Sequence, residues 1–145
     1  SHQYDSVRRL ASMSRIFKKQ DPLHSALQPL GMAIAELGHI HPDITLMQLK
    51  VFVAISVCVT TTTSELSEIL GTDVANLYFS IDILSDGKTY DPDGGGMGLI
   101  QRYPDPERGR RNLLTLTEKG HLIAKLVGIR LGGATDQYLK AAVAV

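Results

Sequence analysis

Four arginines in the C-terminal half of the chain are its most interpretable chemical feature: Arg102, Arg108, Arg110 and Arg111. Only two acidic residues, Asp105 and Glu107, lie among them, so segment 102–111 carries a local excess of two positive charges. Guanidinium groups neutralise nucleic-acid phosphates, and arginine suits a narrow minor groove, where the negative potential is strongest. The segment therefore predicts a contact with nucleic acid. The alternative is an ordinary solvated turn.

Other candidate sites are weaker. His39 and His41 have the spacing of a metal-binding pair, but without a clear third ligand we expect exposed loop histidines. Segment 91–94 begins like a calcium loop, but Arg102 stands at the twelfth position, where a glutamate is needed. Cys58 follows an apolar helical run and is expected in the core rather than as a redox sensor. Because no nucleophile–base pair stands out, we expect neither an enzyme nor a bound metal or cofactor.

The composition sets the class of protein. A length of 145 residues suits one domain. Fifteen Lys and Arg residues balance fifteen Asp and Glu residues, which excludes a generally basic nucleic-acid coat but not a local basic patch. A single cysteine excludes an internal disulfide framework. Gln48 and Lys50 interrupt the longest apolar stretch, and residues 1–20 show no apolar signal segment, so we expect a cytoplasmic protein without a membrane partner.

The elements that position these residues begin with a polar, basic arm at residues 1–20. Apolar spacing predicts a helix over 22–37, with Asp21 as its N-cap and an end at Gly38. A second helix begins after Thr45. Apolar residues surround most of it, which predicts a buried helix, and a β-branched run ends it.

A helix-turn-helix is predicted over about 62–84. Thr62 and Glu65 have the spacing of a capping box for a helix at 64–70, and Thr72 is expected to cap the next helix. Apolar spacing directs one side of that second helix inward: Val74, Leu77, Ile81 and Leu84. Its opposite side is expected to present these residues to solvent: Ala75, Asn76, Phe79, Ser80, Asp82 and Ile83.

A glycine-rich loop follows at 88–97, and its successive glycines are expected to be mobile because they maximise backbone freedom. Two short strands are predicted at 99–103 and 112–116, joined by a long tip that contains the arginines. Helical segments over 117–145 complete the chain, with the final helix at 135–145. The predicted fold class is therefore mainly α with a small β-hairpin (α+β).

Helix, helix-turn-helix, hairpin and helix is the order of a winged helix. Three stretches carry a resemblance to a known family: ITLMQLKVFVAI, TTSELSEILGTDVANLYFSIDILSDG and GLIQRYPDPERGRRNLLTLTEKG. The most specific parts are the GLI-x-R opening at 98–102, the arginine-rich tip and the LTEKG motif at 116–120. Over roughly half of its length, the chain resembles the MarR (multiple antibiotic resistance regulator) family of winged helix-turn-helix transcriptional regulators.

The resemblance implies a single winged-helix domain over 21–145, flanked by N- and C-terminal dimerisation helices at about 22–37 and 117–145. It implies a homodimer on a near-palindromic double-stranded DNA site, with the second helix of the helix-turn-helix in the major groove. It also implies a wing at 98–116 whose tip arginine, matched here by Arg110, reaches the minor groove.

Three features depart from the family pattern. Arg108 stands where the family has the acidic partner of its wing arginine, although Asp105 or Glu107 has the chemistry to replace that partner. The loop 88–97 is an insertion. The recognition helix contains no Lys or Arg, and its acidic residues are Asp73 and Asp82.

The candidate DNA contacts come from the helix starts, the recognition helix and the wing: Thr63, Ser64, Thr72, Asn76, Phe79, Ser80, Arg102, Arg108, Arg110 and Arg111. Hydroxyls at helix starts suit phosphate, Asn76 suits adenine and Phe79 suits a thymine methyl, with packing as the favoured alternative for Phe79. We therefore expect a sequence-specific transcriptional regulator, a repressor in type. The alternatives are a winged helix that binds a protein partner and a repressor gated by a small-molecule effector.

Overall fold

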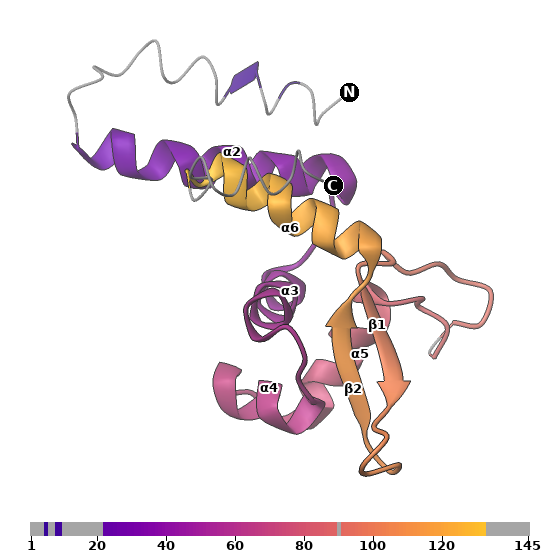
Figure 1. The fold of residues 1–145 in the computed structure, drawn as a ribbon. Helices are drawn as coiled ribbons and strands as arrows, with labels where there is room; N and C mark the ends of the chain where they lie inside the picture. The colour runs from indigo at the N-terminus through magenta and orange to yellow at the C-terminus, as the bar shows by residue number, and fades with distance from the viewer. Residues whose placement is uncertain (1–4, 6–7, 10–21, 90, 133–145) are drawn as a thin grey trace. The chain divides into compact units, whose positions relative to one another are not determined.

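The computed structural model describes residues 5, 8–9, 22–89 and 91–132. Its elements in chain order are α2 (Pro22–Ile40), α3 (Leu46–Cys58), α4 (Thr63–Leu70), α5 (Val74–Leu84), β1 (Ile100–Pro104), β2 (Asn112–Leu116) and α6 (Glu118–Arg130) (Figure 1). The predicted fold class, mainly α with a small hairpin, is confirmed. The Asp21 cap, most of the predicted arm and the predicted helix 135–145 lie outside the described residues.

The chain forms two compact units, one of residues 1–43 with 125–145 and the other of residues 44–124. The first contains α2 and the end of α6, and the second contains the helix-turn-helix and the hairpin. The single domain predicted over 21–145 stays a prediction. Within the described segments, no helix combines the length and the apolar character needed to cross a bilayer.

α2 continues past Gly38 and ends at Ile40, so the prediction of an end at Gly38 is wrong. A glycine inside a helix costs about 1 kcal/mol relative to alanine. The helical bond from the His41 N–H to the Leu37 carbonyl, 2.9 Å long, shows that the last turn forms despite this cost. The chain leaves the helix before Pro42, because the residue preceding a proline avoids helical conformation.

One side of α2 is apolar and exposed. Ala33 and Leu37 are buried, whereas Leu27, Leu30 and Ile34 are 54%, 47% and 52% exposed. The exposed residues follow an i, i+3, i+7 spacing, so they share one stripe of the helix.

α3 begins with a reciprocal capping box, as Thr45 was predicted to start it. The Thr45 Oγ1 accepts the Gln48 N–H (3.1 Å), and the Gln48 Oε1 accepts the Thr45 N–H (2.9 Å). The apolar composition of α3 predicted a helix buried on nearly every side, and this prediction is wrong. Its packed side carries Val51, Phe52 and Ile55, whereas these residues are exposed: Leu46, Val53 and Val57.

Cys58 is exposed, so its predicted place in the core is wrong. It lies in the last turn of α3, where Val57 and Val59 are also exposed, at 77% and 68%. The apolar run was interpreted as burial, but the end of α3 extends beyond the residues against which the helix packs.

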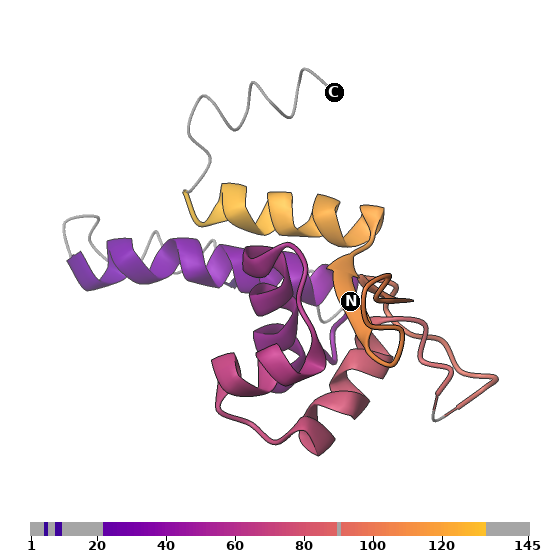
Figure 2. The ribbon, with the colours of Figure 1, turned by 60° about the horizontal axis from the view of Figure 1, so that its bottom comes forward.

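α3, α4 and α5 pack on one another in the second unit, as Figure 2 shows. Thr62 caps α4 by accepting the Glu65 N–H at its Oγ1 (3.2 Å), as predicted. The Glu65 carboxylate does not complete a capping box; its Oε2 accepts the Thr61 hydroxyl instead (3.0 Å). Gly71 ends α4 in the left-handed conformation, at φ 62°.

The N-cap of α5 is Asp73, so the prediction of Thr72 at this position is wrong by one residue. The Thr72 hydroxyl donates back to the Leu70 carbonyl (3.4 Å), and its own carbonyl accepts the Ser67 hydroxyl (2.5 Å). These bonds hold the turn between the two helices, which leaves the cap of α5 to the next residue.

β1 and β2 form the predicted antiparallel hairpin, with paired residues from Ile100↔Leu116 to Pro104↔Asn112. An isolated bridge also joins Leu114 to Thr61, and each N–H bonds the other carbonyl, at 2.8 and 3.1 Å. The hairpin is therefore attached to the segment that leads directly into α4.

α6 begins at the predicted place. The Thr117 Oγ1 accepts the Gly120 N–H (3.0 Å) and donates to the Gly98 carbonyl (2.6 Å). Its last residue, Arg130, pairs with Glu36 of α2 at 2.9 Å between Nη2 and Oε1, a contact inside the first unit.

Candidate nucleic-acid interface

The recognition helix α5 buries more of its circumference than its apolar stripe predicts. Leu77, Ile81 and Leu84 are buried as expected. Ser80 is only 5% exposed and Asp82 is 0% exposed, so their predicted place on the solvent side is wrong. Ser80 follows Leu77 by three residues and therefore shares its side of the helix. A side chain buried there does not reach a base edge.

The outward side of α5 is uncharged and partly aromatic. Ala75 and Asn76 are exposed, Phe79 is 55% exposed and Tyr78 is 49% exposed. Ala75 and Phe79 lie one turn apart on the same side, and Asn76 lies beside them. Tyr78, on the flank, was not among the predicted site residues. Its position in the sequence could have indicated this exposure, because Tyr78 does not share the helical spacing of the buried residues Leu77 and Ile81.

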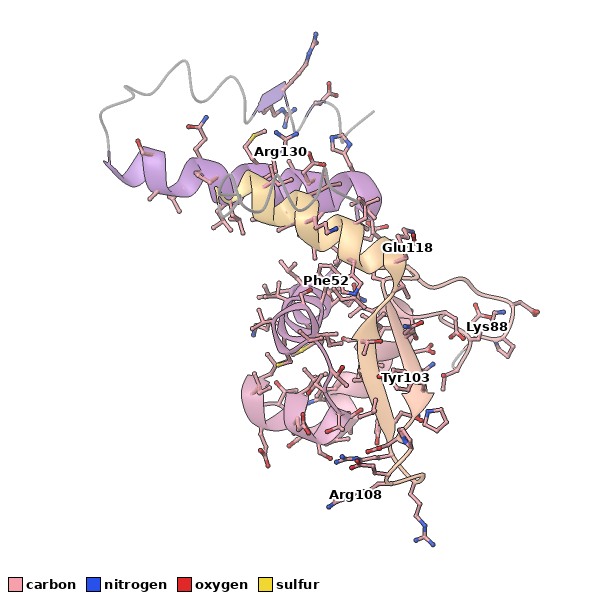
Figure 3. The ribbon with its side chains drawn as sticks, viewed as in Figure 1. Phe52, Lys88, Tyr103, Arg108, Glu118 and Arg130 are labelled. Atoms are coloured by element: carbon pink, nitrogen blue, oxygen red, sulfur yellow. The ribbon has the colours of Figure 1, made fainter. Side chains whose placement is uncertain are left out.

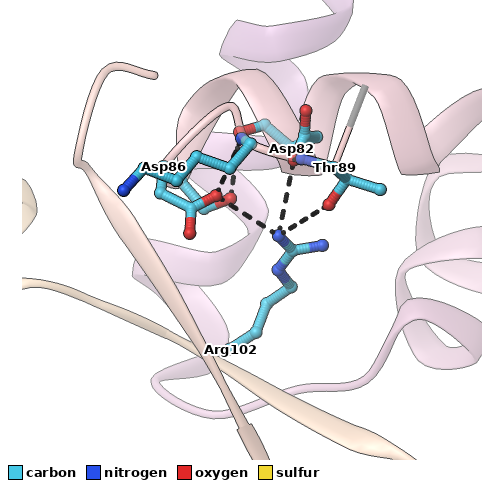
Figure 4. A network of polar contacts seen from close by, with 6 residues as sticks. Asp82, Asp86, Thr89 and Arg102 are labelled. Carbon is cyan, nitrogen blue, oxygen red and sulfur yellow. Dashed lines mark hydrogen bonds and ion pairs between the residues drawn. The ribbon is translucent and has the colours of Figure 1, made fainter. Parts of the chain in front are cut away.

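Asp82 is neutralised by an arginine of the hairpin. Arg102 Nη2 lies 3.4 Å from Asp82 Oδ1 and 3.6 Å from Asp86 Oδ1, and it donates to the Thr89 hydroxyl at 3.2 Å (Figure 4). The Thr89 N–H also donates to Asp82 Oδ1 (3.0 Å). Arg102, predicted as a DNA contact, therefore joins β1 to the end of α5 and to the inserted loop, with 28% of its side chain exposed.

The inserted loop returns to the C-terminal end of α5. The N–H groups of Met97, Gly98 and Leu99 donate to the carbonyls of Ile83, Ser85 and Leu84, at 2.7, 2.8 and 2.8 Å. A helix leaves its last four carbonyls without internal partners, and the loop supplies N–H groups for them. Met97 is only 4% exposed, so the end of the insertion is part of the core.

Gly96 is the residue that allows this close return. Its N–H donates to the Asp86 carbonyl (2.8 Å), and a Cβ at this position would lie 2.6 Å from the backbone N of Gly87. Only glycine fits that space. The predicted mobility of the glycine run stays a prediction.

The wing tip contains a second buried acid. Asp105 is 5% exposed, and its Oδ2 accepts the Arg111 Nε–H at 2.6 Å. Its Oδ1 accepts the Glu107 N–H at 2.9 Å. The hydrogen bond from Arg111, followed by that from the Glu107 backbone, holds the pKa of Asp105 below its ordinary value. Asp105 therefore replaces the missing acidic partner, but it restrains Arg111 rather than Arg110.

The two remaining tip arginines are exposed. Figure 3 shows Arg108 at the free end of the hairpin, beyond Tyr103. Within the described residues, neither Arg108 nor Arg110 forms an ion pair. Of the four predicted wing arginines, the structure thus leaves two for a ligand and holds two in internal pairs.

The hydroxyl residues predicted to contact phosphate at the helix starts also differ in exposure. Ser64 is exposed and Thr63 is half-buried at the start of α4. Thr72 is half-buried, and its hydroxyl already donates within the turn. Across the described residues, no group of three His, Cys, Asp or Glu side chains is arranged to hold a metal ion.

Comparison with solved structures identifies proteins with a similar fold. No family model and no curated protein matches the chain. Among solved structures, the reduced form of MarR from E. coli is 25% identical, with a TM-score of 0.54, over 87% of this chain and 85% of that chain. The chain is a MarR-like winged-helix protein.

Two further matches show the same fold. A mutant E. coli MarR complexed with operator DNA is 22% identical, with a TM-score of 0.51, over 80% of each chain. RV1404 from Mycobacterium tuberculosis is 18% identical, with a TM-score of 0.56, over 86% of this chain and 82% of that chain. The MarR-like winged helix predicted from the sequence motifs is confirmed.

The MarR-like motifs themselves have structural roles. In LTEKG, Thr117 caps α6 and Lys119 donates from Nζ to the Met97 carbonyl (2.9 Å). Gly120 allows α6 to approach the Leu99 carbonyl, which a Cβ would overlap. In GLI-x-R, Gly98 has a φ of 68°, which glycine adopts at no steric cost. The motifs thus fix the joint between loop, wing and helix.

Proposed function

We propose that this protein is a sequence-specific double-stranded DNA-binding transcriptional regulator that acts as a homodimer. One observation carries the proposal: a single compact unit presents an exposed, uncharged recognition helix together with a wing whose tip arginines, Arg108 and Arg110, have no acidic partner among the described residues. The likeness to a MarR solved with operator DNA supports it.

In this proposal the two elements bind different grooves. The major groove, about 12 Å wide, admits an α-helix, so α5 enters it with Asn76 toward adenine. The wing tip reaches the narrower minor groove, where Arg110 meets the most negative potential and Arg108 contacts the flanking phosphate. Ser64 and Thr63 at the start of α4 donate to phosphate, which the partial positive charge of a helix N-terminus favours.

The homodimer is supported by the exposed apolar stripe of α2. Leu27, Leu30 and Ile34 are each about half exposed, and a contiguous apolar stripe on a monomer is unfavourable in water. A twofold dimer buries such a stripe against its own copy, and it matches a near-palindromic DNA site. Light scattering at micromolar concentration tests this part, and a monomer mass would contradict it.

The main test is a salt series with wild-type protein and short duplexes. Binding sites are first selected from random duplex DNA, and the affinity for selected and random duplexes is then measured from 50 to 300 mM salt. We expect selected sites to bind more tightly and the logarithm of affinity to fall linearly with the logarithm of salt concentration. No binding to any duplex at low salt would refute the proposal.

A protein-interaction module is the second candidate. It is favoured by Tyr78 and Phe79, which expose aromatic surface on a helix without any cation, and by the zero net charge of the chain. Aromatic residues of this kind are enriched in protein interfaces. The same salt series separates the two candidates, because a protein-binding module shows no salt-dependent binding to duplex DNA.

A further inference from the structure

No charged side chain between Val74 and Leu84 of the recognition helix is exposed, because the one acid in this range is buried. Asp82 is the one charged residue within α5 (Val74–Leu84). Its side chain is 0% exposed and lies against Arg102, with a further bond from the Thr89 N–H. The acid within α5 is therefore internal to the fold. The exposed side chains of α5 itself are uncharged, and the exposed acid Asp73 lies just before the helix, at its N-cap.

The composition of this surface limits which base edges it recognises. Guanine in the major groove offers two acceptors and is recognised chiefly by Arg or Lys, which α5 lacks. Adenine suits an Asn side chain, and Asn76 is exposed. Phe79 and Ala75 are apolar and exposed one turn apart. The apolar group that a pyrimidine presents in the major groove is a 5-methyl group.

We infer that α5 recognises 5-methylpyrimidines in the major groove, through contact of Phe79 and Ala75 with the methyl group. This inference rests on the proposed DNA-binding function and assigns the base chemistry of the same site. Asn76 bonds an adjacent adenine, so the recognised step is rich in A·T pairs. Thymine and 5-methylcytosine carry the same methyl group, and the experiment below distinguishes them.

Charge complementarity favours DNA over a protein as the occupant of this face. Long-range attraction to DNA needs cations, and two exposed cations without an acidic partner among the described residues, Arg108 and Arg110, lie on the wing tip in the same compact unit as α5. Attraction and discrimination are thus supplied by separate elements. Phe79 is 55% exposed.

The experiment removes the methyl group from the DNA and the ring from the protein. In a selected duplex, each thymine that faces α5 is replaced by deoxyuridine, which lacks only the 5-methyl group. A burial energy near 0.8 kcal/mol for one methyl corresponds to about a fourfold loss of affinity per half-site, because 1.4 kcal/mol is tenfold. Two half-sites give about a sixteenfold loss.

Protein variants assign this loss to one side chain. Phe79→Ala is expected to bind the thymine and deoxyuridine duplexes equally, whereas Phe79→Leu, which keeps an apolar contact, retains most of the difference. Ile69→Ala, at a position on α4 with 56% exposure, is the matched control and is expected to keep the wild-type ratio. Circular dichroism and thermal unfolding check that each variant is folded.

A second pair of duplexes identifies the source of the methyl group. The same positions are changed to C·G pairs, with the cytosine either unmethylated or 5-methylated. A fourfold gain in affinity on cytosine methylation supports the inference and adds 5-methylcytosine as a ligand. A loss of affinity on the change from thymine to deoxyuridine supports the inference with thymine as the ligand.

Two results would overturn the inference while leaving the proposed function intact: wild-type affinity that neither methyl change alters, or a Phe79→Ala variant that weakens all duplexes by the same factor. A wild-type protein that binds no duplex at low salt would instead refute the proposed function itself. In that case the aromatic face of α5 is assigned to a protein partner.

Discussion

The wing tip and the recognition helix present different chemistry, but each buries one acid against an arginine. At the tip, Asp105 is buried against Arg111, and the exposed cations Arg108 and Arg110 outnumber the one exposed acid, Glu107. On α5, Asp82 is buried against Arg102, and the exposed groups are uncharged. The difference shows that a count of charged residues along a segment does not give the charge that the segment presents.

This difference also separates two contributions to binding. A cationic tip gains affinity for any duplex by neutralising phosphate, and that gain depends on salt. A neutral helix gains nothing from phosphate, so it contributes by distinguishing base edges. We therefore expect variants of the two regions to alter different measured quantities.

The largest expected effect comes from breaking the link between the regions. Arg102→Ala removes the arginine that pairs with the buried carboxylate of Asp82, which costs about 3 kcal/mol of unfolding free energy. Urea denaturation measures it. Asp86→Ala is the matched control: Asp86 is 60% exposed, and we expect a loss below about 1 kcal/mol. Equal losses for the two variants would contradict a special role for the buried pair.

The next effect concerns the helix alone. Asn76→Ala removes the proposed bond to adenine, so the affinity gap between selected and random duplexes narrows by roughly 1–3 kcal/mol. The slope of affinity against salt does not change, because no phosphate contact is lost. Binding titrations at several salt concentrations measure both quantities. A changed slope with an unchanged gap would assign Asn76 to the backbone instead.

A smaller effect is expected from the wing. Arg110→Ala weakens binding to selected and random duplexes alike, by about tenfold for each wing in 0.1 M salt, and lowers the salt slope by about one unit per wing. Arg111→Ala is the informative comparison, since Arg111 is held by Asp105. If Arg111→Ala lowers the slope as much as Arg110→Ala, the division between free and restrained tip arginines is wrong.

The smallest effect is on the pH dependence of the tip. Because the pKa of Asp105 is lowered in the folded protein from its ordinary 3.8, its pair with Arg111 stabilises the tip above that pH. The contribution is lost as pH falls through the lowered pKa. The difference in thermal stability between wild type and Asp105→Asn should be constant from pH 7 to about 4.5 and shrink in stronger acid. A difference independent of pH down to 2 would contradict this assignment.

The element order and the faces of most helices could be predicted from the sequence, because they depend on local spacing. Leu77, Ile81 and Leu84 repeat with helical period, and Thr45 precedes its helix with a matching Gln48. The MarR-like assignment came from the combination of the GLI-x-R opening at 98–102, the arginine-rich tip and the LTEKG motif at 116–120. Each of these patterns depends on residues only a few positions apart, so one sequence is enough to recognise it.

The site was harder to predict because its key pairs join residues far apart in the sequence. Nothing near Asp82 indicates that Arg102 neutralises it. Nothing near Arg102 indicates that Asp86, after α5, and Thr89, in the inserted loop, lie beside it. The interpretation of Arg102 as a DNA contact followed from its residue type alone. The prediction that Cys58 lies in the core is wrong because composition does not show which apolar helical turn remains exposed.

The bridge between Thr61 and Leu114 has a consequence for how the protein folds. The two residues are about fifty positions apart, so their meeting requires closure of a long loop, whereas α4 and α5 form from local contacts. We expect the two helices to be structured early and the hairpin to dock late, after the rate-limiting step. Folding kinetics of variants at Leu114 would then show a change mainly in unfolding rate. The wing would be the last part of the winged unit to form and the first to detach. Variants that weaken its docking would therefore lower both the stability of the unit and its affinity for DNA.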